Sequence, residues 1–196
     1  MGKMLCKAAG SILLGAALVA GSGCAPVVIG GGAAGGYAVA TDERTTGRQV
    51  DDATITTRIT AEMVQDATVK ARDVDVNTVN GTVYLIGLVD SAHERERAEA
   101  VARSVAGVRG VVNQLEVGAR SVGQALDDKN LGVRIKAKLI GEPGIRSLSV
   151  DVDVYRGVVH LTGVVESGSQ KAKVFELARS TPGTARLVDN LSVQGR

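Results

Sequence analysis

The sequence predicts an α+β protein of two tandem domains, each an αββαβ unit with a small three-stranded mixed sheet packed against two helices. The first observation is an internal repeat: residues 51–117 align with 127–193 without a gap and share 21 of 67 positions. The second is a glycine-turn hairpin at the same place in both copies, and the third is a helical stripe of apolar residues before each hairpin. Two copies are too few for a solenoid, so we expect two separate small domains.

Each copy opens with a predicted helix. Apolar residues recur every four positions, as expected for one buried helical face: Ile55, Ile59 and Met63 in the first copy, and Leu131, Ile135 and Leu139 in the second. Acidic pairs precede both stripes, at 51–52 and 127–128. We expect these carboxylates to cap the helix N-termini.

A hairpin follows each of these helices. VDVNTVNGTVYLIGLV (74–89) and VDVDVYRGVVHLTGVV (150–165) alternate around turns at Asn80-Gly81 and Arg156-Gly157. The later glycines of these segments, Gly87 and Gly163, are expected at a bend before the next helix.

The second helix and the last strand complete each copy. Ser91-x-x-Glu94 and Ser167-x-x-Gln170 predict capping boxes. These helices are expected to end near Gly107 and Gly183, where a left-handed C-cap suits glycine. The strands VVNQLEV (111–117) and LVDNLSV (187–193) then close the two domains.

The N-terminal region is typical of an export signal. Lys3 and Lys7 precede an apolar run at 8–20, which is shorter than the roughly 20 residues that span a bilayer. Small residues lead to Cys24, so residues 1–23 are predicted to be a lipoprotein signal peptide, with lipid attached to Cys24. Because such signals usually carry Leu where this chain has Gly21, cleavage that leaves a soluble periplasmic protein is the alternative.

The predicted organisation follows from these segments. A Gly/Ala-rich tether at 24–40 precedes a first domain at 41–117, a linker at 118–126 and a second domain at 127–193.

Composition excludes several classes of function. Without Lys3 and Lys7, the chain carries 21 basic and 21 acidic residues, which argues against a nucleic-acid-binding protein. Catalytic motifs such as HExxH, CxxC and GxSxG are absent from the sequence. His93 is expected in the first turn of a helix and His160 on a strand surface. We therefore expect no enzymatic activity, cofactor, metal or small-molecule substrate.

The order of these motifs resembles BON domains. The resemblance rests on the paired NG/RG-x-V-x-L-x-G hairpins and on the lead-in TDERTTGRQVDD (41–52). This lead-in is similar to the T-D-x-R-x-x-G-x-Q-V-D-D signature of dual-BON outer-membrane lipoproteins associated with division and outer-membrane stress. The resemblance implies a lipid-anchored protein on the periplasmic face of the outer membrane that supports membrane integrity and gathers at division sites. It also implies binding to anionic phospholipid through the first helix of the second domain.

Charge supports that helix as the site. The first copy has 7 basic and 11 acidic residues, a net charge of −4, whereas the second has 10 and 8, a net charge of +2. The predicted phospholipid-binding residues are Lys129, Asn130, Arg134, Lys136 and Lys138. Asn130 occupies the position where members of the family insert an aromatic side chain. The alternative is a protein-interaction adaptor, in which this basic helix docks onto the acidic first domain or an envelope partner.

Overall fold

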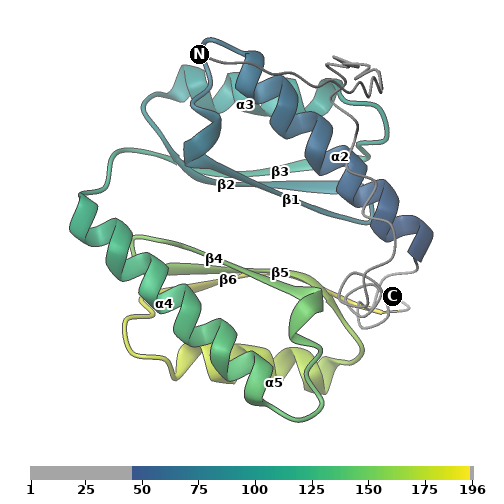
Figure 1. The fold of residues 1–196 in the computed structure, drawn as a ribbon, viewed down its shortest axis with the longest axis vertical. Coiled ribbons are helices and arrows are strands. Elements are labelled where there is room, and N and C mark those ends of the chain that lie inside the picture. Colours follow the sequence, from purple (N-terminus) through teal and green to yellow (C-terminus); the bar gives the residue numbers. More distant parts are fainter. Residues whose placement is uncertain (1–45, 195–196) are drawn as a thin grey trace, which may run out of the picture. The chain divides into compact units, whose positions relative to one another are not determined.

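The computed structural model of the chain describes residues 46–194 (Figure 1). The predicted signal peptide, Cys24, the tether and the first residues of the lead-in lie outside these residues. The elements of the first domain are α2 (Thr46–Gln65), β1 (Val74–Val79), β2 (Thr82–Val89), α3 (Ala92–Ser104) and β3 (Gly110–Val117). Those of the second are α4 (Val122–Gly141), β4 (Val150–Tyr155), β5 (Val158–Val165), α5 (Gly168–Arg179) and β6 (Arg186–Val193).

Each domain contains a three-stranded mixed sheet, which confirms the predicted fold class. The hairpins β1–β2 and β4–β5 are antiparallel, and β3 and β6 add in parallel to β2 and β5. In Figure 1, α2 and α3 cover one face of the first sheet, and α4 and α5 cover one face of the second. No helix within residues 46–194 is long and apolar enough to cross a membrane.

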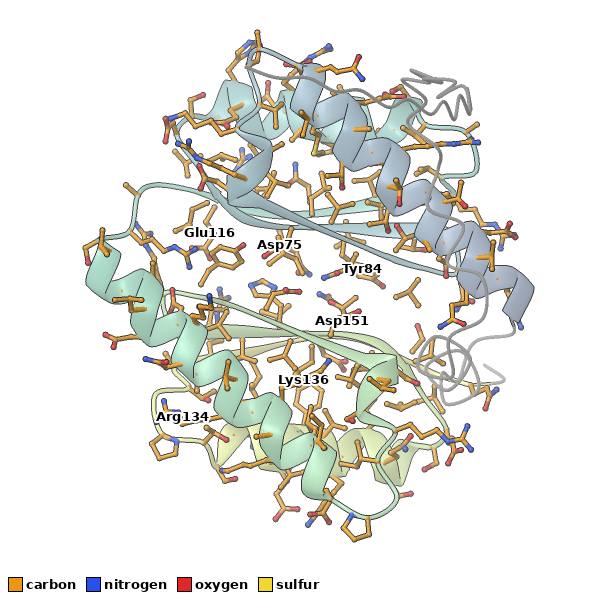
Figure 2. The ribbon with its side chains drawn as sticks, viewed as in Figure 1. Asp75, Tyr84, Glu116, Arg134, Lys136 and Asp151 are labelled. Atoms are coloured by element: carbon orange, nitrogen blue, oxygen red, sulfur yellow. The ribbon has the colours of Figure 1, made fainter. Side chains whose placement is uncertain are left out.

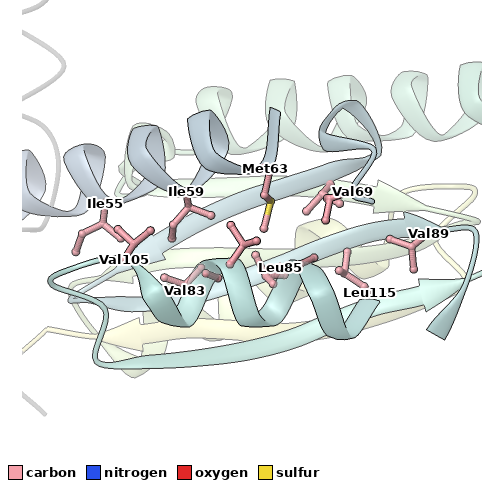
Figure 3. Packing of buried hydrophobic residues seen from close by; sticks show 13 residues of the cluster. Ile55, Ile59, Met63, Val69, Val83, Leu85, Val89, Val105 and Leu115 are labelled. Carbon is pink, nitrogen blue, oxygen red and sulfur yellow. The ribbon is translucent and has the colours of Figure 1, made fainter. Parts of the chain in front are cut away.

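The predicted helix stripes form the centre of each core. Ile59, Met63, Ile135 and Leu139 are almost fully buried, as predicted, and Figure 3 shows the first stripe packed over β2 and β3. All fully buried members of the two cores lie between Ile55 and Leu191. A fragment of residues 41–196 therefore retains both cores, and we expect it to fold without the residues before it.

The first helix of each domain begins earlier than predicted. α2 starts at Thr46, and α4 starts at Val122, where Ser121 forms a capping box with Gln124. Five residues of the expected linker, 122–126, are thus helical. The expectation that the acidic pairs are N-caps is wrong, because these pairs lie inside the helices.

The second acid of each pair instead binds the hairpin turn. Asp52 accepts hydrogen bonds from the backbone N–H groups of Asn80 and Gly81, both at 2.8 Å. Asp128 accepts equivalent bonds from the N–H groups of Arg156 and Gly157, both at 2.9 Å. Each carboxylate therefore connects the first helix to the tip of the hairpin.

We expect Asp128→Ala to lower the free energy of unfolding by about 2–4 kcal/mol, because two turn amides lose their acceptor. The neighbouring change Asp127→Ala is the matched control, since Asp127 is exposed, and it should change stability by less than about 0.5 kcal/mol. Urea denaturation of the two variants measures both effects. Equal losses would contradict the role of Asp128 at the turn.

The tight turns are confirmed and need left-handed backbone. Asn80 and Gly81 have φ of 52° and 79°, and Arg156 and Gly157 have φ of 52° and 74°. Positive φ at both central residues is typical of a type I′ hairpin turn. Arginine rarely adopts this conformation, which agrees with Arg156-Gly157 being the weaker of the two turn signals.

The serine caps of the second helices are confirmed, but the reciprocal half of each box is wrong. Ser91 Oγ accepts from the N–H of Glu94, and Ser167 Oγ accepts from that of Gln170. The Glu94 and Gln170 side chains accept instead from the residue before the serine, Asp90 N–H at 2.9 Å and Glu166 N–H at 2.6 Å. The same two side chains also bind Lys70 N–H and Gly144 O, and so hold the turn that follows the first helix.

Gly87 and Gly163 do not lie at a bend before the next helix, as expected, but within β2 and β5. Gly87 pairs with Val74, and Gly163 with Val150. A Cβ on Gly163 would lie 1.9 Å from the Ser149 carbonyl oxygen, and one on Gly87 would lie 2.2 Å from that of Asp73. Glycine is needed here because a neighbouring backbone occupies the space of a side chain.

Candidate functional site

Helix α4 exposes an apolar ridge opposite its buried face. Val122, Leu126, Val133 and Ile140 are exposed by 80%, 57%, 62% and 65%. At 100° per residue these four side chains fall within about 40° of one another around the helix axis. Isolated exposed apolar residues are ordinary, but an aligned row of four is a typical feature of an interaction surface.

Two of the predicted cations border this ridge. Helical geometry places Lys129 and Lys136 along one edge, whereas Arg134 and Lys138 lie roughly 80° and 120° beyond the other edge. Asn130 lies between the ridge and Arg134. The arrangement is that of an interfacial amphipathic helix, in which apolar side chains are bordered by cations.

The structure separates the predicted site residues into two groups. Lys129, Asn130 and Lys138 are exposed and make no hydrogen bond or ion pair among the described residues. Arg134 donates to the Pro182 carbonyl oxygen at 3.0 Å, and the Lys136 ammonium donates to the Val150 carbonyl oxygen (Figure 2). Arg134 and Lys136 therefore have structural partners within their own domain, and Lys129 and Lys138 are available to an external anion.

The apolar ridge itself was missed by the sequence analysis. Val122 and Leu126 fall within the expected linker 118–126, and the apolar stripe expected for this helix does not include Val133 and Ile140. The Ser121-x-x-Gln124 capping box was the sequence signal that could have extended the helix back to Val122.

Helix α2 lacks the same combination. Its residues that match Lys129, Lys136 and Lys138 in the repeat are Ala53, Thr60 and Glu62. Val50 and Val64, which match Leu126 and Ile140, are exposed apolar residues too, but Thr57 matches Val133 and interrupts the row. The basic apolar surface is therefore a property of the second copy and not of the fold.

Contacts between the two domains involve strand residues. Asn77 Nδ2 donates to Asp153 Oδ2 at 2.6 Å, and Gln114 Oε1 lies 2.8 Å from His160 Nδ1. The expectation that His160 is a surface residue is wrong: it is only 5% exposed, because β3 of the first domain contributes its partner. Within the described residues, no hydrogen bond or ion pair joins the four α4 cations to the first domain.

These contacts change two pKa values in opposite directions. Burial raises the pKa of Asp153 to about 7, with a further contribution from the negative charge of Asp75. Burial lowers the pKa of His160 to about 4, and the positive charge of Arg186 contributes as well. Both groups are therefore stabilised in their neutral forms.

These shifts predict opposite pH profiles for two single variants. The contribution of Asp153 to the unfolding free energy is fully present below the ordinary pKa of an aspartate, and it is lost as the pH rises to about 7. The contribution of His160 to the unfolding free energy is fully present above the ordinary pKa of a histidine, and it is lost as the pH falls to about 4. We therefore expect the unfolding free energy of His160→Gln to fall between pH 4 and about 7, and that of Asp153→Asn to rise between pH 4 and about 6.5. Urea denaturation across this range measures both, and parallel profiles would contradict the prediction.

The duplicated αββαβ module is the arrangement expected from the paired hairpin motifs, which resemble those of BON domains. The family model for the BON domain matches residues 51–119 and 127–195, so the chain belongs to the BON-domain family.

Two relatives support this assignment over most of the chain. The sequence is 36% identical over 180 residues to "Outer membrane lipoprotein DolP" of Haemophilus influenzae, covering 91% of this chain and 92% of that protein. It is 31% identical over 151 residues to "Osmotically-inducible protein Y" of Escherichia coli, covering 76% and 75%. Neither name is that of an enzyme.

A comparison of structures adds a distant match. The chain aligns with CdsD, described as a structural protein of the type III secretion system of Chlamydia trachomatis, with 15% identity and a TM-score of 0.28. The alignment covers 70% of this chain but 59% of CdsD, less than two thirds of its length. A likeness this weak has no bearing on function.

Proposed function

We propose that this protein is a non-enzymatic envelope lipoprotein whose second BON domain binds anionic phospholipid through α4. The observation that carries the proposal is the exposed ridge of Val122, Leu126, Val133 and Ile140 with cations beside it. The name of the Haemophilus influenzae relative supports a place at the outer membrane. The inner leaflet of that membrane faces the periplasm and is the surface that we assign to α4.

The ridge compensates for the lack of an aromatic at Asn130. A Lys or Arg near an anionic surface contributes roughly 1 kcal/mol, and this attraction weakens with salt. Arg134 and Lys136 already donate to backbone carbonyls, so their contribution is expected to be smaller. Burial of the ridge adds about 25 cal/mol per Å² of apolar surface removed from water, and this part does not depend on salt.

Lipid attachment at Cys24 would place the domains beside the same membrane. The signal peptide at 1–23 and the tether at 24–40 remain predictions from the sequence. We expect mass spectrometry of the mature protein to find a lipidated cysteine at its N-terminus. An unmodified N-terminus at Gly23 or Cys24 would favour the soluble periplasmic alternative.

Cosedimentation with vesicles tests the binding proposal. Residues 41–196, without the lipid anchor, are mixed with vesicles of neutral lipid and of neutral plus anionic lipid, at low and at physiological salt. We expect binding that requires the anionic lipid and weakens with salt. Absence of binding under all conditions would overturn the proposal and favour an adaptor that docks an envelope protein on the ridge. Roles in division and outer-membrane integrity are expectations from the resemblance.

A further inference from the structure

A hollow in the first domain is lined by three arginines from two parts of the fold. Arg48 and Arg58 come from α2, and Arg109 comes from the loop before β3. The hollow has a volume of about 520 Å³ and is bordered by the glycines of the hairpin turn and of the loop after α3, Gly81 and Gly107. It lies within the domain whose net charge is negative, so this local positive charge is not an average property of the domain.

The fold holds Arg109 at this position. Its backbone N–H donates to the Gly81 carbonyl oxygen at 2.8 Å. Its side-chain stem lies over the turn, because a Cβ on Gly81 would be 3.0 Å from Arg109 Cδ. Among the described residues, the side chains of Arg58 and Arg109 make no hydrogen bond or ion pair, so two guanidinium groups are available to a ligand.

The residues that line the hollow carry a net positive charge, even though two of them are acidic. Asp51 and Asp52 are the two acidic residues that line it, against three arginines. The Asp52 carboxylate already accepts two backbone hydrogen bonds from the turn, at 2.8 Å each. Three arginines against two carboxylates leave the hollow with one positive charge in excess.

The second domain provides an internal comparison. Its matching hollow, beside Arg156 and Gly157, contains Gln124 where the first domain has Arg48. Ala185 stands at the position of Arg109. The remaining arginines are engaged, since Arg134 donates to Pro182 O and Arg156 donates to Ala119 O. The fold forms without three arginines here, so folding does not require the arginines of the first domain.

We infer that the hollow of the first domain binds a phosphate group, either as free phosphate or as part of a lipid headgroup. A tetrahedral oxyanion offers several oxygens to several guanidinium forks, whereas a carboxylate offers two and is matched by a single arginine. The inference concerns a different domain from α4 and does not depend on the lipid-binding proposal.

The test uses ¹⁵N-labelled residues 41–196, titrated with inorganic phosphate at constant ionic strength. We expect saturating shifts of the Gly107 and Arg109 amide signals. The variant Arg48→Gln/Arg109→Ala carries the residues that the second domain already tolerates, and it should weaken phosphate binding roughly 10- to 100-fold. Arg179→Ala is the control, because this exposed arginine of α5 lies outside the hollow and it should leave the titration unchanged.

The outcomes are distinct. No saturation in the wild-type fragment, or equal affinity in the double variant, would overturn the inference. If the double variant also reduces binding to phosphatidylglycerol vesicles, the phosphate belongs to a lipid headgroup. If phosphate binding is lost and vesicle binding is kept, it is a soluble phosphate. Failure of the α4 proposal would be seen separately, as absence of vesicle binding while the phosphate titration still saturates.

Discussion

Replacing Lys129 and Lys138 by glutamate is expected to abolish vesicle binding by residues 41–196. Both lysines are exposed and make no hydrogen bond or ion pair among the described residues, so the change should leave the fold intact. Each reversal removes an attraction of roughly 1 kcal/mol and introduces a repulsion of similar size. Lys138 lies on the far side of α4 from Lys129 and contributes less, so a total of about 2–4 kcal/mol corresponds to a loss of roughly 30-fold to several hundred-fold in affinity. Cosedimentation with anionic vesicles at low salt measures it.

A matched control variant distinguishes the effect of the α4 lysines from the effect of the net charge of the fragment. Arg72→Glu/Arg179→Glu changes the charge of the fragment by the same amount, and both arginines are exposed and lie outside α4. We expect this variant to keep most of its vesicle binding. If both double variants lose binding equally, attraction depends on overall charge and α4 is not the site.

The variant Leu126→Gln/Val133→Gln, which leaves the net charge unchanged, tests whether the apolar ridge contributes to vesicle binding. We expect weaker vesicle binding at every salt concentration, with an unchanged slope against salt, because only the apolar part of the interaction is removed. Normal vesicle binding together with loss of an envelope protein in pull-downs would instead assign the ridge to the adaptor function.

Gly163→Ala is expected to unfold the second domain or to come close to it. Gly163 has φ of 146°, and its new Cβ would meet the Ser149 carbonyl oxygen at 1.9 Å. The contact is with backbone inside a sheet, so relief requires the strands to separate. We expect a loss of about 3–5 kcal/mol in unfolding free energy, which is a large part of the stability of a small domain.

Thermal and urea unfolding measure this effect, with Gly168→Ala as control. A Cβ on Gly168, the first residue of α5, meets nothing within 4 Å, and alanine is a good helix former. Gly87→Ala provides the same test in the first domain, where the clash is with Asp73 O. A stable Gly163→Ala protein with an unchanged sheet would show that the two backbones can move apart at little cost.

The sequence alone determined the fold class, both hairpins and the buried helix stripes. Ile59 and Leu139 were identified as core, and Asn80-Gly81 as a turn, because helical period and left-handed backbone are local properties. The repeat strengthened each prediction, since two divergent copies had to satisfy the same pattern. The cations of α4 were also found in this way, as a difference between the copies.

The tertiary structure decided the features that depend on residues distant in the chain. Asp128 was assigned to a helix cap because its partners, at Arg156 and Gly157, lie 28 and 29 residues further on. His160 followed the pattern of an exposed strand position, and only the other domain buries it. Gly163 is required because of a carbonyl on a neighbouring segment.

Contacts between residues distant in the chain also explain which parts of the candidate sites could not be predicted from the sequence. The ridge of α4 includes Val122 and Leu126 only because the helix extends back to Val122, and the three arginines line one hollow because α2 and the loop before β3 meet at a turn. Periodicity reports which side of an element is buried, but it does not report which other element lies against it. That information resides in the packing of the chain.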